Sequence, residues 1–419
     1  MPVARLLHTT WRALALAAAI WAGLAAAAHA ERWVGSWASA QQTPEDNNAL
    51  PAHELDDATL RQVVRLSLGG PRLRVRLSNA FGTQPLHVVS AHVARAPTAG
   101  SARIDPASDR PLTFAGQPDV VIPAGAEYLS DPVALPAPAL SRIAVSLYFP
   151  AAPAQQTSHP GSRATSYLAH GNQVSAADLP QARKVEHWFQ LSGIEVGGPA
   201  ARASVAVLGD SITDGHGATT NGDDRWPDQF ARRLQGAGPT RGLGVLNLGI
   251  GGNRVLLDGL GPNALARFDR DVLAQAGVRA VILLEGVNDL GTLTRDHPVD
   301  AAAHAGLVHQ IVAAYAQMAA RAHAHGLRAI GATILPYGGS DYYHPDAANE
   351  ADRQAVNQWI RAPGHFDAVV DFDRAMSDPA HPERLRPAYD SGDHLHPSPA
   401  GYRAMAQAVP LSLVSERTP

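Results

Sequence analysis

The sequence contains no cysteine, and only one of its 34 basic side chains, Lys184, is a lysine. The lack of cysteine excludes disulfides and every site that depends on a thiol. No serine stands three residues before Lys184, so a Ser-x-x-Lys catalytic pair is excluded as well. The Gly-Lys-Ser/Thr signature of a phosphate-binding loop and the His-Glu-x-x-His zinc motif are also missing. These absences remove several common kinds of catalytic site.

Charge of either sign is sparse. The 34 basic and 38 acidic side chains nearly cancel, to a net charge of -4, and no run of like charges occurs. Proteins that bind nucleic acid or an anionic membrane surface usually carry a basic patch. We therefore expect neither as a partner, and no motif indicates a cofactor.

Long apolar runs are absent except near the N-terminus. There, Arg5 and Arg12 precede a stretch rich in Ala, Leu, Ile and Trp that ends in AHA at residues 28–30. This order is typical of a secretory signal peptide. The alternative is a retained membrane anchor, although the run is at the short end for a bilayer span. We therefore predict that residues 1–30 are a cleaved signal peptide, that no membrane span remains, and that the protein is exported to a periplasm or out of the cell.

The rest of the chain divides into two halves of different periodicity. From residue 61 to residue 79, apolar residues alternate with Arg and Ser on both sides of a Gly-Gly-Pro turn, which predicts a hairpin. "RIAVSLYF" (142–149) alternates in the same way, and connectors rich in Pro, Ala and Gly separate such segments. We predict an antiparallel β-sandwich domain over residues 31–198.

After "GGPAARA" the pattern changes to short, continuously apolar runs separated by helical stretches. Such runs suit parallel strands that are buried on both faces. They cover residues 204–210, 244–249, 280–286, 329–335 and 368–373. One intervening helix is predicted over residues 301–325, with Asp300 as its N-cap and Gly326 as its stop. Residues 199–419 are therefore predicted to be an α/β domain, a doubly wound five-stranded parallel sheet with helices on both faces.

A serine follows the first of these runs. "VAVLGDSITDGHG" (205–217) places Ser211 at a strand-to-helix turn, on the edge of the sheet where such folds bind ligands. The glycine before it allows a close approach, and the amides of a helix start can face an anion. The alternative is an ordinary capping serine. Asp214, three residues later, is expected to cap the following helix; the alternative is that it polarises the site.

A nucleophilic serine requires a base and a group that orients the base. "YDSGDHLHPSPAGY" holds Asp393 and His396 on a loop bounded by glycine and proline. Asp393 would accept from one ring nitrogen of His396 while the other ring nitrogen faces Ser211. The alternatives are a capping aspartate beside a surface histidine, or a metal pair formed by His394 and His396, for which no third ligand stands out.

Acyl transfer also needs hydrogen-bond donors for an oxyanion. Gly252, in "NLGIGGNR" after the second run, offers an unobstructed N–H, and Asn288, in "EGVNDLG" after the third, offers a side-chain amide. The alternatives are a glycine turn and a turn asparagine; a dinucleotide fingerprint is excluded by Arg254 at its third glycine position. All the candidates follow strands of one predicted sheet and therefore share one edge.

Four blocks of this sequence resemble the SGNH hydrolases, also called the GDSL esterase/lipase family. They are "GDSITDG", "NLGIGG", "GVND" and "DHLHP", and they span residues from about 203 to 415. The resemblance implies a flavodoxin-like α/β/α sandwich and a serine esterase without a cofactor or a metal. It further implies Ser211 as the nucleophile, His396 and Asp393 as the other members of the triad, and Ser211, Gly252 and Asn288 as the oxyanion hole.

Within that family, "GSWASA", "LSLGG…VRLSNAFG" and "RLRPAYDSGDHLHP" resemble an exported bacterial branch with an N-terminal β-domain, often labelled as xylanase-associated esterases. That similarity implies short acyl esters, acetyl above all, on carbohydrate or a small alcohol. The alternatives are a lipase or lysophospholipase, and an exported polysaccharide-binding protein whose hydrolase domain is degenerate.

Three features leave alternatives open. The side chains of Arg72, Arg74 and Arg76 form either a solvated face or a basic stripe for acidic sugar chains. Trp33 and Trp37 either pack inside the sandwich or stack on sugar rings. The loop "GHGATTNGDDRWPD", with His216 and Trp226, either borders the substrate or is a plain connector.

Overall fold

The computed structural model describes residues 31–415 of the chain. The predicted signal peptide, residues 1–30, lies outside the described residues. From Trp33 onward the chain forms one compact unit. Among its described residues no helix combines the length and the apolarity that crossing a membrane requires. The domain boundary between residues 198 and 199 stays a prediction.

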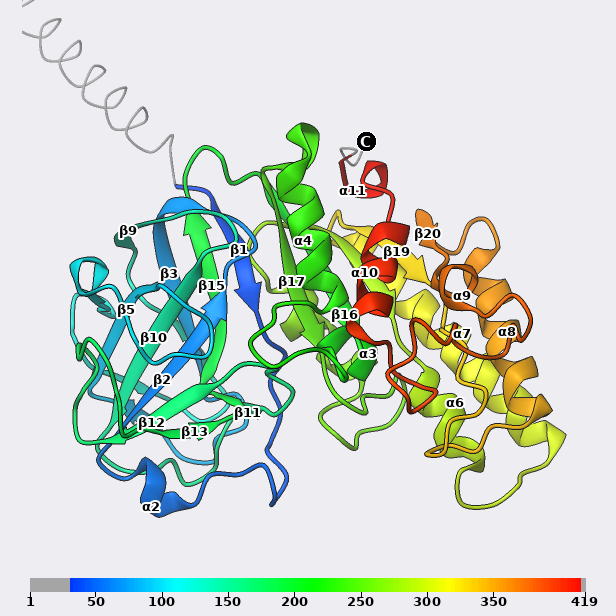
Figure 1. Ribbon diagram of the computed structural model, residues 1–419, viewed down its shortest axis with the longest axis horizontal. Coiled ribbons are helices and arrows are strands. Elements are labelled where there is room, and N and C mark those ends of the chain that lie inside the picture. Colours follow the sequence, from blue (N-terminus) through cyan, green and yellow to red (C-terminus); the bar gives the residue numbers. More distant parts are fainter. Residues whose placement is uncertain (1–30, 416–419) are drawn as a thin grey trace, which may run out of the picture. The chain divides into compact units, whose positions relative to one another are not determined.

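Two antiparallel sheets form the first part of this unit (Figure 1). One sheet has the order β1 (Trp33–Ala38), β15 (Leu191–Gly197), β3 (Gly70–Ser78) and β8 (Glu127–Leu129), with β9 (Val133–Ala137) also paired to β3. The other has the order β13 (Arg183–Val185), β12 (Ser166–His170), β2 (Ala58–Arg65), β10 (Arg142–Phe149), β5 (Ser90–Ala96) and β6 (Arg110–Pro111). Smaller elements are α2 (Ala52–Leu55) and the two-stranded pairs β4 (Leu86–Val88) with β7 (Val120–Ile122) and β11 (Ser158–His159) with β14 (Trp188–Phe189). The two main sheets share one apolar core, so the predicted β-sandwich is confirmed.

The hairpin predicted over residues 61–79 is wrong. β2 pairs with β10 and β12, whereas β3 pairs with β15, β8 and β9, so the two strands lie in opposite sheets. The connection between them passes from one sheet to the other and is held by Ser36, whose Oγ donates to the carbonyl of Leu68 at 2.7 Å. Alternating apolar residues identify a strand, but they do not identify the strand with which it pairs.

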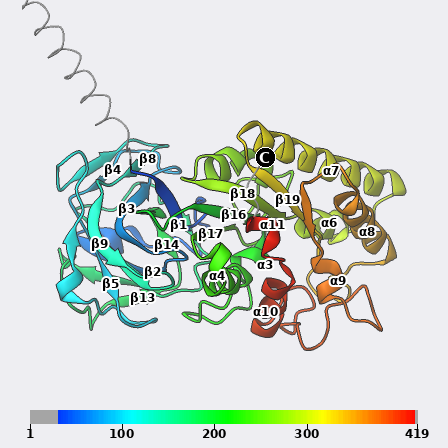
Figure 2. The same ribbon diagram turned by 90° about the horizontal axis from the view of Figure 1, so that it is seen from above.

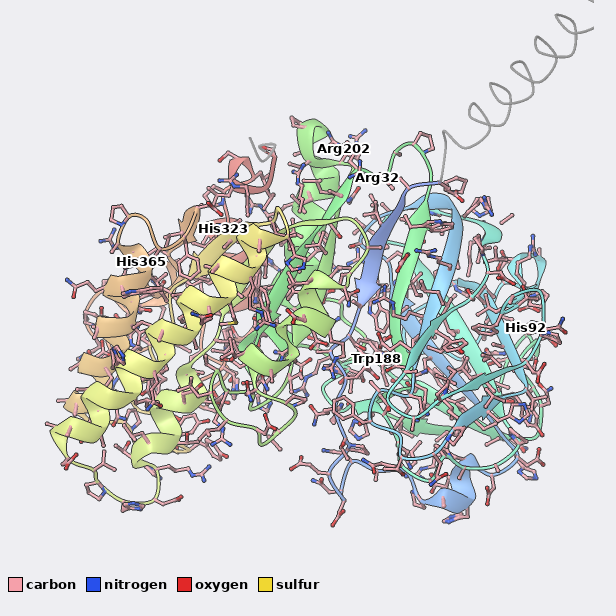
Figure 3. The ribbon with its side chains drawn as sticks, turned by 180° about the vertical axis from the view of Figure 1, so that it is seen from behind. Arg32, His92, Trp188, Arg202, His323 and His365 are labelled. Carbon is pink, nitrogen blue, oxygen red and sulfur yellow. The ribbon has the colours of Figure 1, made fainter. Side chains whose placement is uncertain are left out.

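The tryptophans near the start of the chain pack against protein. Trp37 is buried and meets Trp188, labelled in Figure 3, edge to face, with ring centroids 4.9 Å apart. The guanidinium of Arg74 lies 4.7 Å from the ring centroid of Trp33. Of the two interpretations of these tryptophans, the structure therefore favours packing.

The second part of the unit is built on a parallel sheet with the strand order β17–β16–β18–β19–β20. Its strands are β16 (Ala203–Gly209), β17 (Leu243–Gly249), β18 (Val278–Leu284), β19 (Arg328–Ala332) and β20 (Ala368–Val370). Each overlaps one of the five apolar runs, so the predicted five-stranded parallel sheet is confirmed. The strand order reverses between β16 and β18, and ligands of open α/β sheets bind at such a switch point, beyond the carboxyl ends of the strands.

Helices cover both faces of this sheet. Figure 2 shows α7 (Ala301–Ala324) on one face and α4 (Trp226–Gly236) with α10 (Pro399–Ala408) on the other. The remaining helices are α3 (Ser211–Asp214), α5 (Ala264–Phe268), α6 (Val287–Thr294), α8 (Ala347–Arg361), α9 (Phe372–Met376) and α11 (Ser412–Ser415). The helix predicted over residues 301–325 is confirmed: the side chain of Asp300 accepts from the N–H of Ala303 at 2.9 Å, and Gly326 adopts a φ of 70° just beyond the end.

The two parts meet through backbone and hydroxyl groups. The N–H of Gly35, in β1, donates to the carbonyl of Ala276 at 2.8 Å. The Oγ of Ser67 accepts from the N–H of Val245, in β17, at 2.9 Å. Because both contacts use buried groups, they fix the β-sandwich beside the first strands of the parallel sheet.

Candidate active site

Ser211 stands at the carboxyl end of β16, as the first residue of α3. Asp210 caps this short helix, because its carboxylate accepts from the N–H of Ile212 at 2.8 Å. A Cβ at Gly209 would stand 2.2 Å from the Oγ1 of Thr213, so the tight turn from strand to helix requires glycine there. The turn presents the hydroxyl of Ser211 to a cleft above the sheet.

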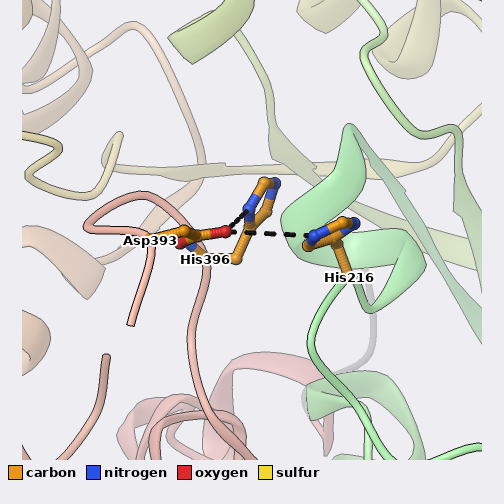
Figure 4. A group of neighbouring side chains, drawn as sticks. All are labelled: His216, Asp393 and His396. Carbon is orange, nitrogen blue, oxygen red and sulfur yellow. Dashed lines mark hydrogen bonds and ion pairs between the residues drawn. The ribbon is translucent and has the colours of Figure 1, made fainter. Parts of the chain in front are cut away.

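The structure brings Ser211, His396 and Asp393 together, although they lie far apart in the sequence. The hydroxyl of Ser211 is 2.8 Å from the Nε2 of His396. The Nδ1 of His396 is 2.6 Å from the Oδ2 of Asp393, as Figure 4 shows. The Oδ1 of Asp393 also accepts from the backbone N–H groups of His396 at 2.8 Å and Leu395 at 3.0 Å. The hydroxyl of Ser391 donates to the same oxygen at 3.0 Å, so four groups hold the carboxylate in line with the imidazole.

These contacts set the charge of the carboxylate. Burial alone would raise the pKa of Asp393, but the hydrogen bonds from the ring and the backbone N–H of His396 and from the N–H of Leu395 lower it to well below its usual range. Asp393 is therefore ionised throughout the neutral range and is suited to stabilise a protonated imidazole.

Gly252 and Asn288 line the same cleft as Ser211. Asn288 lies in α6, which follows β18. Its Oδ1 accepts from the hydroxyl of Tyr343 at 2.6 Å and its Nδ2 donates to the carbonyl of Asn253 at 2.7 Å. These two bonds fix which end of the amide is the nitrogen, and a primary amide has a second N–H to offer. Gly252 has a φ of 70°, a conformation that favours glycine.

A buried arginine beneath the cleft ties the strand ends together. Arg267, in α5, donates to the carbonyls of Gly209 at 3.0 Å and Leu248 at 2.7 Å, and to the carboxylate of Glu285 at 3.3 Å. It therefore joins the ends of β16, β17 and β18. It also donates to the Oδ1 of Asn253, the residue whose carbonyl accepts from Asn288. No local sequence pattern identifies Arg267, because its partners are distributed over three strands.

Three buried carboxyl groups near these strand ends have raised pKa values. Burial raises the pKa of Asp210 to about 7, with the charge of Asp289 adding to the effect, and burial raises the pKa of Asp289 to about 6. Burial and the charge of Asp210 also raise the pKa of Glu285 well above its usual value. The guanidinium of Arg267 is shared with the carboxylate of Asp271, 2.9 Å away, so it offsets the burial of these groups only in part, and the folded protein binds protons here more tightly than the unfolded chain does.

Asp214 does not cap the following helix as expected. It is the last residue of α3, and Asp210 is the cap. The Oδ1 of Asp214 instead lies 2.9 Å from the Nε2 of His159, in β11, whose Nδ1 is 2.7 Å from the carbonyl of Ala40. Both side chains are buried. A histidine from the β-sandwich part thus holds the turn that carries Ser211, a pairing that no local sequence pattern indicates.

The cleft has a volume of about 1200 Å³, and both parts of the chain line it. Glu45, Arg163 and His187 come from the first part, and His216 comes from the loop after α3. The loop therefore borders the cleft, whereas its Trp226 is buried in the core.

His216 packs against His396, with ring centroids 4.0 Å apart. Burial lowers the pKa of His216 to about 4, and the charges of His396 and Arg163 act in the same direction. His216 is therefore neutral at neutral pH.

His216, Asp393 and His396 also place metal-ligating atoms within 4.8 Å of one another (Figure 4). Two of these atoms, the Oδ2 of Asp393 and the Nδ1 of His396, are only 2.6 Å apart and bonded to each other. Two ligands of one tetrahedral zinc ion stand roughly 3.3 Å apart, given bond lengths of about 2.0 Å. The group fits an aspartate–histidine pair better than a metal site. His394 lies outside this group and bonds Asp390 at 2.6 Å.

Comparison with known proteins identifies the family of this part of the chain. Residues 207–404 match the GDSL-like Lipase/Acylhydrolase family. This part of the chain is a GDSL domain. The match covers the strand ends that carry Ser211, Gly252 and Asn288 and the loop that carries Asp393 and His396. As an acylhydrolase of this family, the chain is a carboxylic ester hydrolase. A comparison with curated proteins gives no match.

Solved structures of GDSL proteins and acetylesterases resemble the GDSL domain at low identity. A GDSL-like lipase from Bacteroides thetaiotaomicron is 20% identical, with a TM-score of 0.38, and the match covers 52% of this chain and 90% of the other. A carbohydrate acetylesterase from Sinorhizobium meliloti is 14% identical, with a TM-score of 0.38, and the match covers 51% of this chain and 99% of the other. An acetylxylan esterase from Geobacillus stearothermophilus is 22% identical, with a TM-score of 0.37, and the match covers 49% of this chain and 91% of the other. Similarity at this level does not indicate the substrate of this chain.

The buried carboxyl groups predict how stability depends on pH. Because burial raises the folded-state pKa of Asp210 to about 7, its stabilising contribution is complete below the unfolded value near 4 and is lost as pH rises through about 7. The slope is at most about 1.4 kcal/mol per pH unit for each such carboxyl. Asp210→Asn keeps the capping oxygen but removes the titration, so its melting temperature should fall less between pH 5 and pH 8 than that of the wild type.

The matched control is Asp300→Asn, which changes the N-cap of α7, away from the cleft. It should show the same pH dependence as the wild type. If Asp210→Asn and the wild type have parallel curves of melting temperature against pH, Asp210 is not the titrating group.

Proposed function

We propose that the protein is an exported serine esterase that hydrolyses short acyl esters, chiefly acetyl esters, of carbohydrates. One observation carries the proposal: the hydroxyl of Ser211, the imidazole of His396 and the carboxylate of Asp393 form a continuous run of hydrogen bonds at 2.8 and 2.6 Å in the wall of an open cleft. This is the arrangement that turns a serine hydroxyl into a nucleophile.

In the first step, the Oγ of Ser211 attacks the carbonyl carbon of the ester while the Nε2 of His396 accepts the hydroxyl proton. Asp393, ionised and bonded to Nδ1–H, stabilises the imidazolium that forms. The imidazolium then donates the proton to the oxygen of the leaving alcohol, and an acyl-serine remains. Water, deprotonated by the same imidazole, releases the acid and restores Ser211.

The negative oxygen that forms in each step needs donors. We assign them to the backbone N–H groups of Ser211 and Gly252 and to the Nδ2 of Asn288. Ser211 supports this assignment because it begins a helix, where N–H groups lack partners within the helix. Asn288 supports it because Tyr343 and Asn253 hold its amide in a fixed orientation before substrate binds.

The character of the cleft supports a carbohydrate alcohol. Its walls carry many groups that form hydrogen bonds with hydroxyl groups, among them Glu45, Asn48, His187 and Asp341. Tyr342 also lines the cleft and is 58% exposed. An exposed aromatic ring of this kind can pack on the face of a sugar. A long alkyl chain would bury few of these polar groups favourably.

We further propose that residues 1–30 direct export, that residues 31–198 wall the cleft and brace the catalytic sheet, and that residues 199–419 carry out the reaction. The role of residues 31–198 is supported by the side chains of this part that line the cleft beside Ser211. The proposal would be contradicted if the protein acted as a lipase on long acyl chains, or if it bound polysaccharide without hydrolysing esters.

Substitutions at Ser211 and Asn288 test the mechanism. Ser211→Ala removes the nucleophile and should lower kcat for p-nitrophenyl acetate by at least about a thousandfold. Asn288→Ala removes one donor of three and should lower kcat by about a hundredfold, close to 3 kcal/mol of barrier. Ser101→Ala, a serine outside the cleft, is the control and should behave as the wild type. Wild-type turnover by Ser211→Ala would refute the mechanism.

Acyl length and alcohol test the substrate class. We expect kcat/KM to fall in the order p-nitrophenyl acetate, butyrate, palmitate, and acetate to be released from acetylated xylan. The physical reason is the polar wall, which favours a small acyl group and a hydroxyl-rich alcohol. Faster hydrolysis of the palmitate than of the acetate ester would instead establish a lipase.

A further inference from the structure

We propose that Arg163 binds an anionic group of the substrate, a sugar carboxylate, so that the preferred substrates are acetyl esters of acidic, uronic-acid-containing carbohydrates. This inference rests on the proposed function and names the substrate class of the same cleft. It comes from a cation whose charge the protein leaves unmatched beside the catalytic histidine.

Arg163 lies between β11 and β12, in a loop of the β-sandwich part that forms one wall of the cleft. The loop packs tightly on the turn that carries Ser211, because a Cβ at Gly161 would stand 1.7 Å from the Oδ2 of Asp214. His159, two residues earlier, bonds the same carboxylate. The position of Arg163 is therefore fixed relative to the nucleophile.

The backbone of Arg163 is held in a conformation that disfavours a side chain. Its φ of 47° lies in the left-handed region, which is unfavourable for a residue other than glycine. The carbonyl of Arg163 accepts from the N–H of Asn221 at 2.8 Å, and the side chain of Asn221 accepts from the N–H of Thr165 at 2.9 Å. Strain that the surroundings enforce in this way often marks a functional position.

The guanidinium of Arg163 has little to bind in the protein. Among residues 31–415 its one hydrogen-bond partner is the Nδ1 of His216, at 3.3 Å, and its Nε is buried without a partner. The two carboxylates of this region, Asp214 and Asp393, are hydrogen-bonded to His159 and His396, and neither forms an ion pair with Arg163 within residues 31–415. Arg163 forms no ion pair with any described residue.

His216 adds no second positive charge at neutral pH, because burial lowers its pKa to about 4. A partly desolvated guanidinium with free donors binds a carboxylate well, since its planar N–H groups match the two carboxylate oxygens. Only the ring of His216 separates the guanidinium of Arg163 from His396. The carboxylate that Arg163 binds would therefore belong to the sugar unit that carries the ester, or to its neighbour.

The other arginines of the cleft and two of those on β3 bind oxygen atoms of the protein. Arg74 and Arg76, two of the three residues of the basic stripe on β3, share the carboxylate of Glu195 at 2.6 and 2.7 Å, so the protein offsets part of the charge of the stripe. On the far wall of the cleft, Arg295 pairs with Asp296 at 3.3 Å. Of the three arginines that line the cleft, Arg254 also binds within the protein, to the carbonyl of Asp258.

A matched pair of substrates tests the proposal: an acetylated methyl glucuronoside and the acetylated methyl glucoside that lacks the carboxylate. For the wild-type protein, kcat/KM should favour the glucuronoside by about tenfold, the size of effect expected for a partly exposed charge-assisted contact. Arg163→Gln should bring the ratio close to one, Arg163→Lys should keep part of it, and 0.5 M salt should reduce it. Arg95→Gln, which removes an arginine paired with Asp105 outside the cleft, is the control and should keep the wild-type ratio.

Equal hydrolysis of the two esters by the wild type would overturn the inference and leave the proposed function standing. An Arg163→Gln variant that slows both esters by the same factor would also overturn it, because a merely structural residue has that effect. Preference for an ester that carries a phosphate over the glucuronoside would contradict a sugar carboxylate as the ligand. Failure to hydrolyse either ester, together with p-nitrophenyl acetate, would overturn the proposed function itself.

Discussion

The structure depends on a buried guanidinium that holds three strand ends in place. Arg267 is fully buried and binds the carbonyls that end β16 and β17 and the carboxylate that follows β18. Ser211, Gly252 and Asn288 each follow one of these strand ends, so their spacing is set by the same side chain. Removing the charge would leave several buried acceptors without a donor, which is costly in a protein interior. The strand ends and the side chain of Arg267 thus position Ser211, Gly252 and Asn288. The loop after the last strand adds Asp393 and His396.

The β-sandwich part completes the site. His159 binds the carboxylate of Asp214, on the short helix that begins with Ser211, and Arg163 reaches the ring of His216, which packs on His396. In the proposed mechanism the GDSL domain supplies the groups that carry out acyl transfer, and the preceding part supplies a wall of the cleft.

The sequence predicted the catalytic half well for a physical reason. Continuous apolar runs mark buried parallel strands, parallel strands align their carboxyl ends, and Ser211, Gly252, Asn288, Asp393 and His396 all stand beyond such ends or on the loop near the last one. The hairpin before Asn79 was wrong because alternation is a property of one strand, whereas pairing depends on contacts far along the chain. Asp214 was misassigned for a similar reason: its partner, His159, lies 55 residues earlier. Arg163 and Arg267 carry no local motif, and only their surroundings distinguish them from the other arginines.

The central claim is that Ser211 is the nucleophile of an ester hydrolase. The most direct measurement is labelling of the full protein with a fluorophosphonate, followed by peptide mapping of the adduct and an assay of residual activity. The structure predicts one adduct per chain, on Ser211, with activity lost in proportion to labelling and with no labelling of His396→Ala. An adduct on another residue, or esterase activity that persists after Ser211 is fully labelled, would contradict the account.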